Sequence, residues 1–547
     1  TKGLAAEASV SFDNIGGMNE TTNKEYRYMN SNASITSDGT LVTTPAIYGT
    51  DSETLGHTQP FERLMLRSDF QAKVDYNRTF GKHQVGGALI YDMQSVVKNG
   101  RNNSQKNQSV LVNATYTYDN RYSLNAVFNR SGSAYLPDGD KYSNYPAVSA
   151  AWIVSNEAFM EKVTPINLFK IRASYGLSGW DGNLSHELWR QSYGSGGAGY
   201  NFGVNAGGQS GGSEGDLPVI GLVAEKSQKA TFGFDLAAFD NRLNATVEGF
   251  YEKRSDILVS GANSTSGIIG ITVGQVNEGI YKYKGVDASL SWNDKIGDFH
   301  YGIGASMSYL NTEVVNVNQA YQEYDYLYTK GNRIGQMYGL EAIGFFNSQQ
   351  EINNSPQQTF SDVAPGDVKY KDQNGDNRID EKDVVKMFGS SVPRFYFGFN
   401  LNFSYKRLEL SADFQGMTGV TVSLLNSPLY SPLVSNGNIS NTFLNEEISW
   451  TPENKTNATM PRLTTQENLN NYRASSLWYR DGSFLKLRNL LVAYTFPKSQ
   501  TRFADLKVFV QGTNLFSLDN IHFADPEQLG IAYPSTRSYW AGIKLNF

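Results

Sequence analysis

The densest run of metal-ligating side chains lies between residues 372 and 383, which read DQNGDNRIDEKD. A calcium ion takes about six to eight oxygen ligands, and regularly spaced oxygens let one loop wrap around it. Loop positions 1, 3, 5, 9 and 12 carry such oxygens, in Asp372, Asn374, Asp376, Asp380 and Asp383. The backbone carbonyl of Arg378, at position 7, would add a ligand. We therefore predict a structural calcium site that orders this loop, and Mg²⁺ suits it less.

Two features separate this loop from the EF-hand pattern. Its glycine, Gly375, stands at position 4, while position 6 holds Asn377, a residue that tolerates the left-handed backbone conformation. Position 12 is Asp383 in place of the bidentate glutamate, which predicts a lower affinity. The alternative interpretation is a turn rich in Asp and Asn that holds no metal.

Aromatic side chains in the long polar segments are candidates for substrate binding, because their faces can stack on sugars or pack against peptides. The candidates are Trp180, Trp189, Tyr193, Tyr200, Trp450 and Trp478. Such rings could equally pack the loops internally or lie at a membrane interface. The sequence leaves these alternatives open.

Motifs that would indicate catalysis are weak. Residues 194–199 read GSGGAG and match GxGxxG, but a Gly/Ser-rich stretch surrounds them and no helix pattern follows. The chain has no cysteine, and its five histidines show no metal-ligand spacing. The net charge of −6 disfavours nucleic acid, because phosphate affinity comes from Lys and Arg. We expect neither enzymatic activity nor a nucleic-acid partner.

The elements that must position these residues are strands, because side-chain polarity alternates with period two. Across residues 395–406, one face would carry Phe395, Phe397, Phe399, Leu401, Phe403 and Tyr405. The opposite face would carry Tyr396, Gly398, Asn400, Asn402, Ser404 and Lys406. Successive strand side chains point to opposite faces, so this segment has one apolar and one largely polar face.

Strand and loop lengths favour a membrane barrel over a soluble β-sandwich. Patterned runs reach about 10 residues, the length that a tilted strand needs to cross a bilayer. Short turns, such as Asp119-Asn120 and Lys406-Arg407, alternate with long polar stretches at 182–227, 346–393 and 420–484. Outer-membrane barrels have short periplasmic turns and long external loops. The sequence thus predicts an all-β, transmembrane antiparallel barrel.

Composition agrees with that prediction. The 547 residues include 33 Tyr and 52 Gly, with 18% charged residues, a profile that favours strands and turns. Mean hydropathy is −0.43, and no run of about 18 apolar residues indicates a transmembrane helix. In a barrel only every second residue faces lipid, so low mean hydropathy is expected. The last segment alternates up to Phe547, an aromatic end that resembles the assembly signal of outer-membrane barrels.

Several segments resemble the SusC/RagA-like, TonB-linked outer-membrane transporters. Residues 141–152 (KYSNYPAVSAAW) are similar to that family's RYGFFPSVSAGW segment, and residues 170–176 (KIRASYG) to its LRASYG strand. Residues 365–370 (PGDVKY), leading into the Asp-rich loop, are similar to PGDIKYKDxNGDGxID. Further similarities lie at FLKLRN, NLF and DPE, which occupy residues 484–489, 514–516 and 525–527.

The resemblance implies active import across the outer membrane. Members of the family have a barrel of about 22 strands filled by a plug domain. A SusD-like surface lipoprotein delivers oligosaccharides or peptides to the external loops, and TonB acts on the plug from the periplasm. The expected partners of this chain are therefore such a lipoprotein, TonB, lipid and a glycan or peptide substrate.

We expect residues 1–547 to be the barrel domain without the plug and the first strands. About eighteen segments have strand-like patterning. The final segment, 538–547, should then pair with an upstream segment and not with residues 5–12, because unpaired edges are unfavourable in lipid. Two other functions remain open: a passive porin or adhesin barrel, and a soluble calcium-dependent carbohydrate-binding β protein.

Overall fold

The computed structural model describes residues 2–18, 20–35, 41–52, 54–58, 61–98, 104–185, 188–200, 209–263, 268, 270–271, 273–426, 448–464, 466–521, 524–529 and 535–547. Its main feature is one antiparallel sheet of sixteen strands. In sheet order these are β1 (Leu4–Met18), β6 (Phe61–Phe80), β7 (His83–Lys98), β8 (Ser104–Tyr118), β9 (Tyr122–Ser133), β10 (Tyr142–Ile153), β11 (Ile166–Trp180), β14 (Glu225–Ala238), β15 (Leu243–Ser260), β16 (Gln275–Ile296), β17 (Phe299–Asn316), β24 (Phe395–Tyr405), β25 (Leu408–Thr418), β28 (Phe484–Phe496), β29 (Asp505–Asp519) and β30 (Ser538–Asn546).

Shorter elements form small two-stranded sheets in the loops. They are β2 (Thr21–Asn23) with β5 (Gly56–Thr58), β3 (Tyr28–Ile35) with β4 (Leu41–Tyr48), β12 (Tyr193–Tyr200) with β13 (Gln209–Glu214), β18 (Gln336–Gly339) with β23 (Val385–Ser390), β19 (Ala342–Phe345) with β21 (Val368–Tyr370), β20 (Gln357–Gln358) with β22 (Arg378–Ile379), and β26 (Thr421–Ser423) with β27 (Tyr479–Asp481). Short helices are α1 (Gln349–Asn353) and α4 (Lys498–Thr501). Among the described residues, no helix has the length and apolar character needed to cross a membrane.

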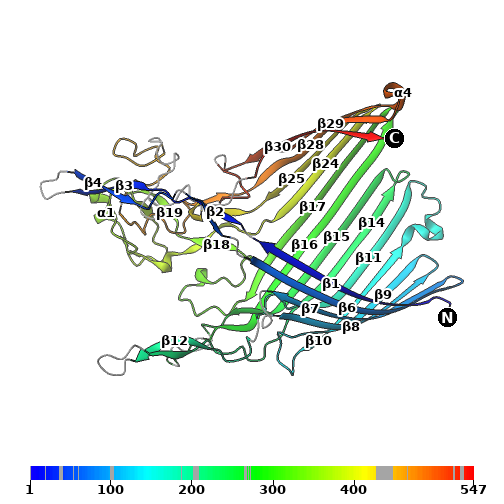
Figure 1. Ribbon diagram of the computed structural model, residues 1–547, viewed down its shortest axis with the longest axis horizontal. Coiled ribbons are helices and arrows are strands. Elements are labelled where there is room, and N and C mark those ends of the chain that lie inside the picture. Colours follow the sequence, from blue (N-terminus) through cyan, green and yellow to red (C-terminus); the bar gives the residue numbers. More distant parts are fainter. Residues whose placement is uncertain are drawn as a thin grey trace.

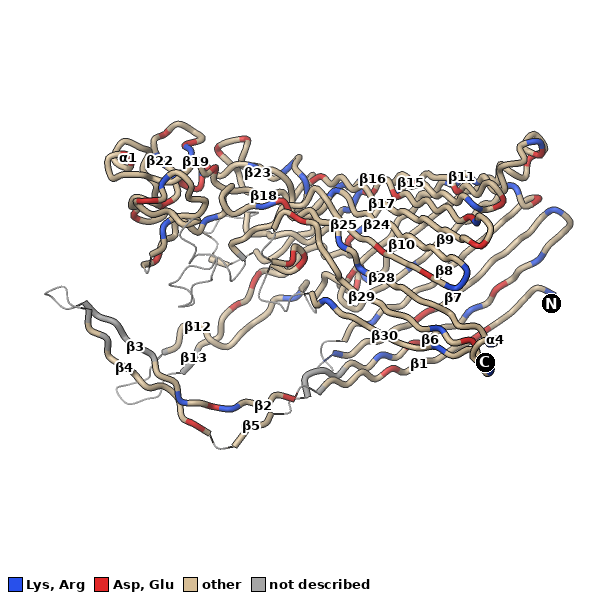
Figure 2. Tube along the Cα trace, turned by 90° about the horizontal axis from the view of Figure 1, so that it is seen from above, with Lys and Arg blue, Asp and Glu red and all other residues tan. Residues whose placement is uncertain are grey.

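The predicted alternation produces two distinct faces of the large sheet. On β9 and β10, Leu124 and Val148 are 48% and 45% exposed, whereas Asn125 and its partner Ser149 are partly buried. The sheet curls along the strand order (Figures 1 and 2). Side chains splay apart on a convex face and crowd together on a concave one. The apolar face is therefore the convex, outer face, and the polar face lines the interior, as in an outer-membrane barrel.

The apolar face continues from strand to strand because the register keeps like residues opposite one another. Ala8 pairs with Ala72, Leu89 with Val112, Ile171 with Phe234, Ala305 with Phe399, and Val510 with Ala541. Phe399 also pairs with Phe414, and their rings stack with centroids 4.3 Å apart. A shift of one residue in any pairing would place polar side chains on this face. The all-β barrel architecture predicted from the sequence is confirmed.

Short turns and long loops lie at opposite ends of the sheet. The turn between β8 and β9 has Asp119 and Asn120 at φ of 51° and 52°, the two left-handed residues that a tight hairpin of type I′ requires. This end also carries both chain termini, whereas the long connections gather at the other end (Figure 1). The expected separation of turns and loops is thus present.

The strands β1 and β30 are the two edges of the sheet, since β1 pairs with β6 and β30 with β29. In the part of the chain that the structure describes, residues 538–547 do not pair with residues 5–12, as expected. Pairing with an upstream segment stays a prediction. Sixteen strands are two fewer than the sequence-based count of about eighteen, and strand-like patterns also occur in separate hairpins such as β3–β4.

Residues 317–394, 420–426 and 448–483 fold together beyond the loop end of the strands, and we call them the loop subdomain (Figure 1). One of its apolar cores contains Leu340, Val368, Tyr370 and Ile379. A second contains Leu424, Met460 and Trp478. Leu477 packs against both cores, so the two long connections before β24 and β28 form one packed unit.

Candidate functional site

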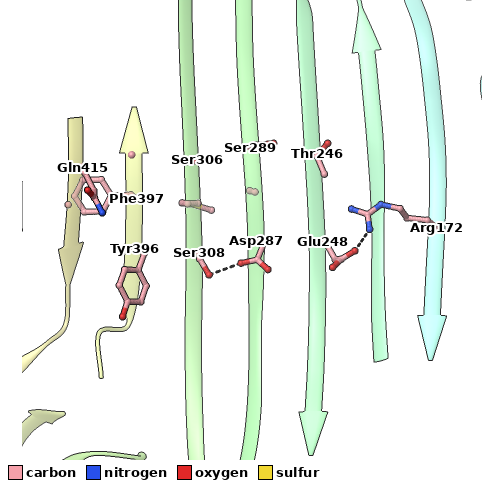
Figure 3. A pocket seen from close by; sticks show the side chains of 14 residues that line it. Arg172, Thr246, Glu248, Asp287, Ser289, Ser306, Ser308, Tyr396, Phe397 and Gln415 are labelled. Atoms are coloured by element: carbon pink, nitrogen blue, oxygen red, sulfur yellow. Dashed lines mark hydrogen bonds and ion pairs between the residues drawn. The ribbon is translucent and has the colours of Figure 1, made fainter. Parts of the chain in front are cut away.

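A row of polar side chains crosses the inner face of the sheet on five strands. It runs from β11 to β24 through Arg172, Glu248, Asp287, Ser308 and Tyr396 (Figure 3). Glu248 pairs with Asp287, Asp287 with Ser308, and Ser308 with Tyr396, so the row follows the cross-strand register. Ser308 Oγ donates to Asp287 Oδ1 at 2.6 Å. These residues line a pocket on the inner wall.

The arginine of this row reaches its partner across an intervening strand. Arg172 is on β11 and Glu248 on β15, and the residue between them on β14 is Gly233. Because Gly233 has no side chain, the Arg172 guanidinium can pass over β14 and form an ion pair with the Glu248 carboxylate. The dashed line in Figure 3 marks this contact.

Neighbouring inner-wall charges are also neutralised. Lys170 Nζ lies 3.2 Å from Asp235 Oδ2, and Thr246 Oγ1 donates to Asp235 Oδ1 at 3.1 Å. Nearer the loops, the Arg254 guanidinium lies 4.7 Å from the centroid of the Tyr283 ring. Ser227 Oγ donates to Glu252 Oε1 at 2.7 Å. Hydrogen-bonding groups and aromatic faces thus cover the interior wall, which suits a passage for polar solutes.

A buried carboxylate organises the loop subdomain. Asp367 is fully buried, and its two oxygens accept hydrogen bonds from Arg462, Asn468, Asn471 and the backbone N–H of Ala364. The Arg462 Nε–Asp367 Oδ1 distance is 2.7 Å. A buried charge is tolerated only when it is paired and hydrogen-bonded, and this network meets that condition.

Asn470 extends the network to the adjacent strand. Its amide donates to Val368 O at 2.9 Å, and its own carbonyl accepts the Tyr370 hydroxyl at 2.7 Å. Burial raises the pKa of Tyr370 well above its usual value, so this phenol stays protonated and donates. The network holds residues 364–370, next to the Asp-rich loop, in a fixed position.

The predicted calcium loop adopts a compact turn in which side-chain oxygens accept backbone N–H groups. Asp372 accepts from Gly375 and Asn377, Asp376 from Arg378, and Asp383 from Gln373 and Asp380. Asn377 has a φ of 62°, as its position predicted. Across the described residues, no three His, Cys, Asp or Glu side chains converge in a metal-binding arrangement.

These contacts leave the ligand capacity of the loop unsaturated. A carboxylate can accept about four hydrogen bonds. The carboxylates of Asp372 and Asp383 each accept two backbone N–H groups, and that of Asp376 accepts one. Asp380 lies 3.3 Å from Arg378 Nε, an ion pair that pulls it toward the loop's own arginine. Asn374 Nδ2 donates to Asp376 Oδ2 at 3.0 Å. Calcium binding by Asp372, Asn374, Asp376, Arg378, Asp380 and Asp383 stays a prediction.

Two of the six candidate aromatic residues pack the loop subdomain internally. Trp478 is fully buried, stacks on Tyr472 with centroids 5.4 Å apart, and donates to Asn471 O at 2.7 Å. Trp450 is buried and donates to Asn347 Oδ1 at 3.3 Å. Trp450 and Trp478 therefore pack the loops internally, which is one of the alternatives that the sequence left open.

The other four aromatic candidates lie at the end of β11 or in the connection that follows it. Trp180 and Tyr193 are 54% and 76% exposed, so these two rings are available to a ligand. Trp189 is partly buried against a small core that contains Leu136, Leu184 and Leu222. The side chain of Tyr200 lies outside the described residues. The substrate-binding role of this group stays a prediction.

Two sequence motifs that the resemblance singled out meet in space. Lys486, from FLKLRN on β28, lies with its Nζ 2.5 Å from Asp525 Oδ1 and 2.6 Å from Glu527 Oε2, both in the DPE motif. Arg488 Nη2 is 2.6 Å from Glu527 Oε1. This cluster fastens the 524–529 connection to the sheet. Sequence spacing alone could not reveal it, because 39 residues separate Lys486 from Asp525.

The individual residues of the inner-wall row could not be predicted from the sequence. Arg172 lies in the KIRASYG segment, whose alternation identified a strand but not which polar side chains would be neighbours. The partners Glu248 and Asp287 lie on β15 and β16, and only the register brings them beside one another. Alternation could have placed each residue on the polar face, and no further signal is present in the sequence.

Comparison with known proteins gives consistent relatives, although no known family profile matches the chain. The TonB-dependent receptor P26 of Formosa agariphila is 28% identical over 461 residues, which cover 79% of this chain and 45% of that protein. The TonB-dependent receptor P3 of the same organism is 26% identical and covers 86% and 51%, respectively. SusC of Bacteroides thetaiotaomicron is 22% identical and covers 79% and 43%. The chain spans about half the length of the curated relatives it matches.

Among solved structures, the RagAB peptide transporter superposes with a TM-score of 0.75 at 18% identity, covering 100% of this chain and 60% of that chain. The RagAB peptide importer in its open-open state superposes with a TM-score of 0.71. At this identity the likeness establishes the fold alone. Together with the curated relatives, it agrees with the resemblance found in the sequence motifs.

Proposed function

We propose that this chain, a SusC-like, TonB-dependent type of outer-membrane β-barrel, forms the wall of an active importer of oligosaccharides or oligopeptides. One observation carries the proposal: a continuous apolar outer face and a polar, ion-paired inner face belong to the same curved sheet. Such a sheet encloses a polar passage within lipid. The relatives are receptors and transporters, which agrees with transport and gives no indication of enzymatic activity.

Active import requires further polypeptide in the passage. A plug that fills the interior would contact the inner-wall row of Arg172, Glu248 and Asp287, and TonB would act on that plug. Porins, which conduct passively, leave their channel open. A wall with paired charges at close spacing provides many fixed hydrogen-bonding positions for a plug surface. The chain covers about half the length of its relatives, and we propose that the plug that TonB contacts belongs to the remaining part.

We propose that the loop subdomain is the surface that binds a SusD-like lipoprotein. It is a packed unit with its own cores, so it can present a fixed surface at the external end of the barrel. RagAB, the structural neighbour, is a peptide transporter by its title. The substrate of the present chain is proposed only as a glycan or peptide oligomer. Calcium bound in the 372–383 loop would stabilise this binding surface.

The test measures uptake and partner binding with the full-length protein in the source bacterium. An affinity-tagged protein is extracted with detergent, and its co-purifying polypeptides are identified. Uptake of labelled oligosaccharides and oligopeptides is compared before and after TonB depletion. The proposal expects a surface lipoprotein and TonB-dependent uptake. Uptake that persists without TonB, together with ion conductance in planar bilayers, would instead establish the passive porin. Recovery without detergent would establish the soluble β protein.

A further inference from the structure

The outer face of the sheet changes from apolar to cationic near the loop end of β8 and β9. Along β9 the outward apolar residues end at Phe128, and Arg130 follows on the same face. Along β8 they end at Val110, and Lys106 lies further toward the loops. Both cations are exposed, whereas alternate residues such as Asn129 are partly buried on the inner face. Two positive charges thus lie outside the wall, at the end of its apolar band.

The distance from the turns places this change at the external boundary of the membrane. Gln108 is ten residues from Tyr118 at the turn end of β8, about 33 Å along the strand. A strand tilted by about 40° rises about 25 Å over that length, which is the height of the apolar band in outer-membrane barrels. On β15, Lys253 shares the outer face with the exposed Tyr251 and is also ten residues from the turn-end residue Leu243. Two separate parts of the sheet therefore give the same boundary.

At this boundary the outer face is hollowed into a groove of about 600 Å³. Its lining extends from β1 to β10 and includes Phe70, Met93, Lys106, Gln108, Gly132 and Tyr142. The Tyr142 ring lies across Gly132, where an added Cβ would come within 2.5 Å of the ring's Cε1 atom. The glycine thus makes room for the ring, which forms one wall of the groove.

A chain of hydrogen bonds fixes the polar groups of the groove. The Tyr142 hydroxyl donates to Gln108 Oε1 at 2.9 Å, and Gln108 Nε2 donates to the Tyr91 hydroxyl at 2.8 Å. The Arg130 guanidinium lies 5.6 Å from the centroid of the Tyr142 ring, within the range of a cation–π interaction. An aromatic face, and not a carboxylate, therefore holds Arg130 beside the groove.

The groove carries positive charge that no acidic side chain compensates. Its other charged lining residues are paired, Lys141 with Asp138 and Asp69 with Arg67. In the part of the chain that the structure describes, neither Lys106 nor Arg130 forms an ion pair with a carboxylate. Basic residues at a membrane surface attract anionic lipid headgroups, and Lys and Arg donors suit phosphate oxygens. The charge and the location of the groove both fit such a headgroup.

We propose that this groove binds the anionic headgroup of a phosphate-bearing membrane lipid, with Lys106 and Arg130 as its cationic ligands. The acyl chains of that lipid lie on the apolar face toward the turns, along the exposed side chains of Val110 and Val112. The inference rests on the outer-membrane location of the barrel and goes beyond the proposed import function. The groove lies on the lipid side of the wall, so its ligand is a component of the membrane and not the transported solute.

The test uses the full-length protein in detergent, and native mass spectrometry counts the lipids bound during a titration. The probes are phosphatidylglycerol, which is anionic, phosphatidylcholine, which has no net charge, and inorganic phosphate. The principal variant combines Lys106→Gln with Arg130→Gln. Arg78→Gln is the matched control, because Arg78 also lies over an aromatic ring, that of Phe80, but at the turn end of β6. Heat-dependent mobility in gels verifies that each variant is folded.

The unsubstituted protein should retain one phosphatidylglycerol at a lower concentration than it retains phosphatidylcholine. Each lost cation should weaken that binding by about five-fold, the usual contribution of one basic residue near an anionic lipid surface, and Arg78→Gln should leave it unchanged. Unchanged affinity in the double variant, or an equal loss in Arg78→Gln, would overturn the proposal.

Two other outcomes would also overturn it. Equal binding of the two lipids would show that the cations have no role in recognition. Displacement of phosphatidylglycerol by an equal concentration of inorganic phosphate would identify a site for a free anion. Uptake that proves independent of TonB would refute the proposed import function and leave the lipid measurement intact.

Discussion

Arg172 on β11 and Glu248 on β15 form an ion pair across β14, over the position of Gly233. A Cβ atom on Gly233 would lie 2.4 Å from Val247 O and 3.0 Å from Glu248 Cα. Both contacts are with backbone, which cannot move aside as a flexible side chain can. The glycine therefore permits close strand packing and leaves the path of the arginine open.

The substitution Gly233→Ala should lower the free energy of unfolding by about 1–3 kcal/mol, since overpacking forces backbone shifts. Gly87→Ala is the matched control, because a Cβ there would find its nearest neighbour at an ordinary 3.6 Å. Thermal unfolding in detergent, followed by the heat-dependent gel shift of barrels, measures both. Equal stability of the two variants would contradict the packing argument.

The two faces of β24 should respond differently to charge. Phe399 lies on the apolar outer face between Ala305 and Phe414, whereas Asn400 lies on the inner face between Gly304 and Asp413. Phe399→Arg should destabilise the barrel by about 2–4 kcal/mol if the position is near the bilayer midplane. Asn400→Arg should have a much smaller effect. Urea unfolding in lipid vesicles measures the difference, and similar losses would reverse the assignment of the faces.

The sequence predicted the strands and their faces well, because alternation depends only on local residue order. The segment 395–406 illustrates this: every apolar residue predicted on one face shares that face in β24. The inner-wall partners Arg172 and Glu248 could not be predicted, since they are 76 residues apart and meet only through the register of three strands. The burial of Trp478 could not be predicted from the sequence either, because it depends on the packing of two long connections.

Calcium should raise the melting temperature of the full-length protein if the 372–383 loop binds it. The expected stabilisation follows the ratio of ligand concentration to Kd, about 2.7 kcal/mol at a hundred-fold excess over Kd. Chelation should reverse the shift, and Mg²⁺ should produce less. Asn374→Ala removes one predicted ligand and should weaken the effect. Identical melting in calcium and chelator would support the metal-free turn.

The 524–529 connection should loosen at low pH. The pKa of Asp525 and that of Glu527 lie below their ordinary values of 3.8 and 4.5. Burial alone raises both, but hydrogen bonds from Lys486 to Asp525 and from Arg488 and Lys486 to Glu527 lower them more. A depressed carboxylate pKa stabilises the fold above the unfolded pKa, and this stabilisation disappears as pH falls through the folded value.

Protection of residues 524–529 from hydrogen exchange should therefore be constant above about pH 5 and decline below about pH 4. Lys486→Met should weaken that pH dependence, because Asp525 would lose the cation that lowers its pKa and Glu527 would keep only Arg488. Lys544→Met, on the exposed edge strand β30, is the control and should retain it. Protection that increases on acidification would contradict the sign of this argument.

Asp367 should be required for the loop subdomain but not for the barrel. Asp367→Ala leaves the buried amides of Asn468 and Asn471 and the Arg462 guanidinium without their acceptor. Removing one partner of a buried ion pair usually costs about 3–5 kcal/mol. Asp362→Ala, at an exposed position in the same segment, is the matched control. Limited proteolysis should cleave the Asp367→Ala subdomain at low protease concentration, while the heat-dependent gel shift of the barrel stays unchanged. Cleavage of both variants at the same rate would show that the network around Asp367 contributes little to holding these loops together.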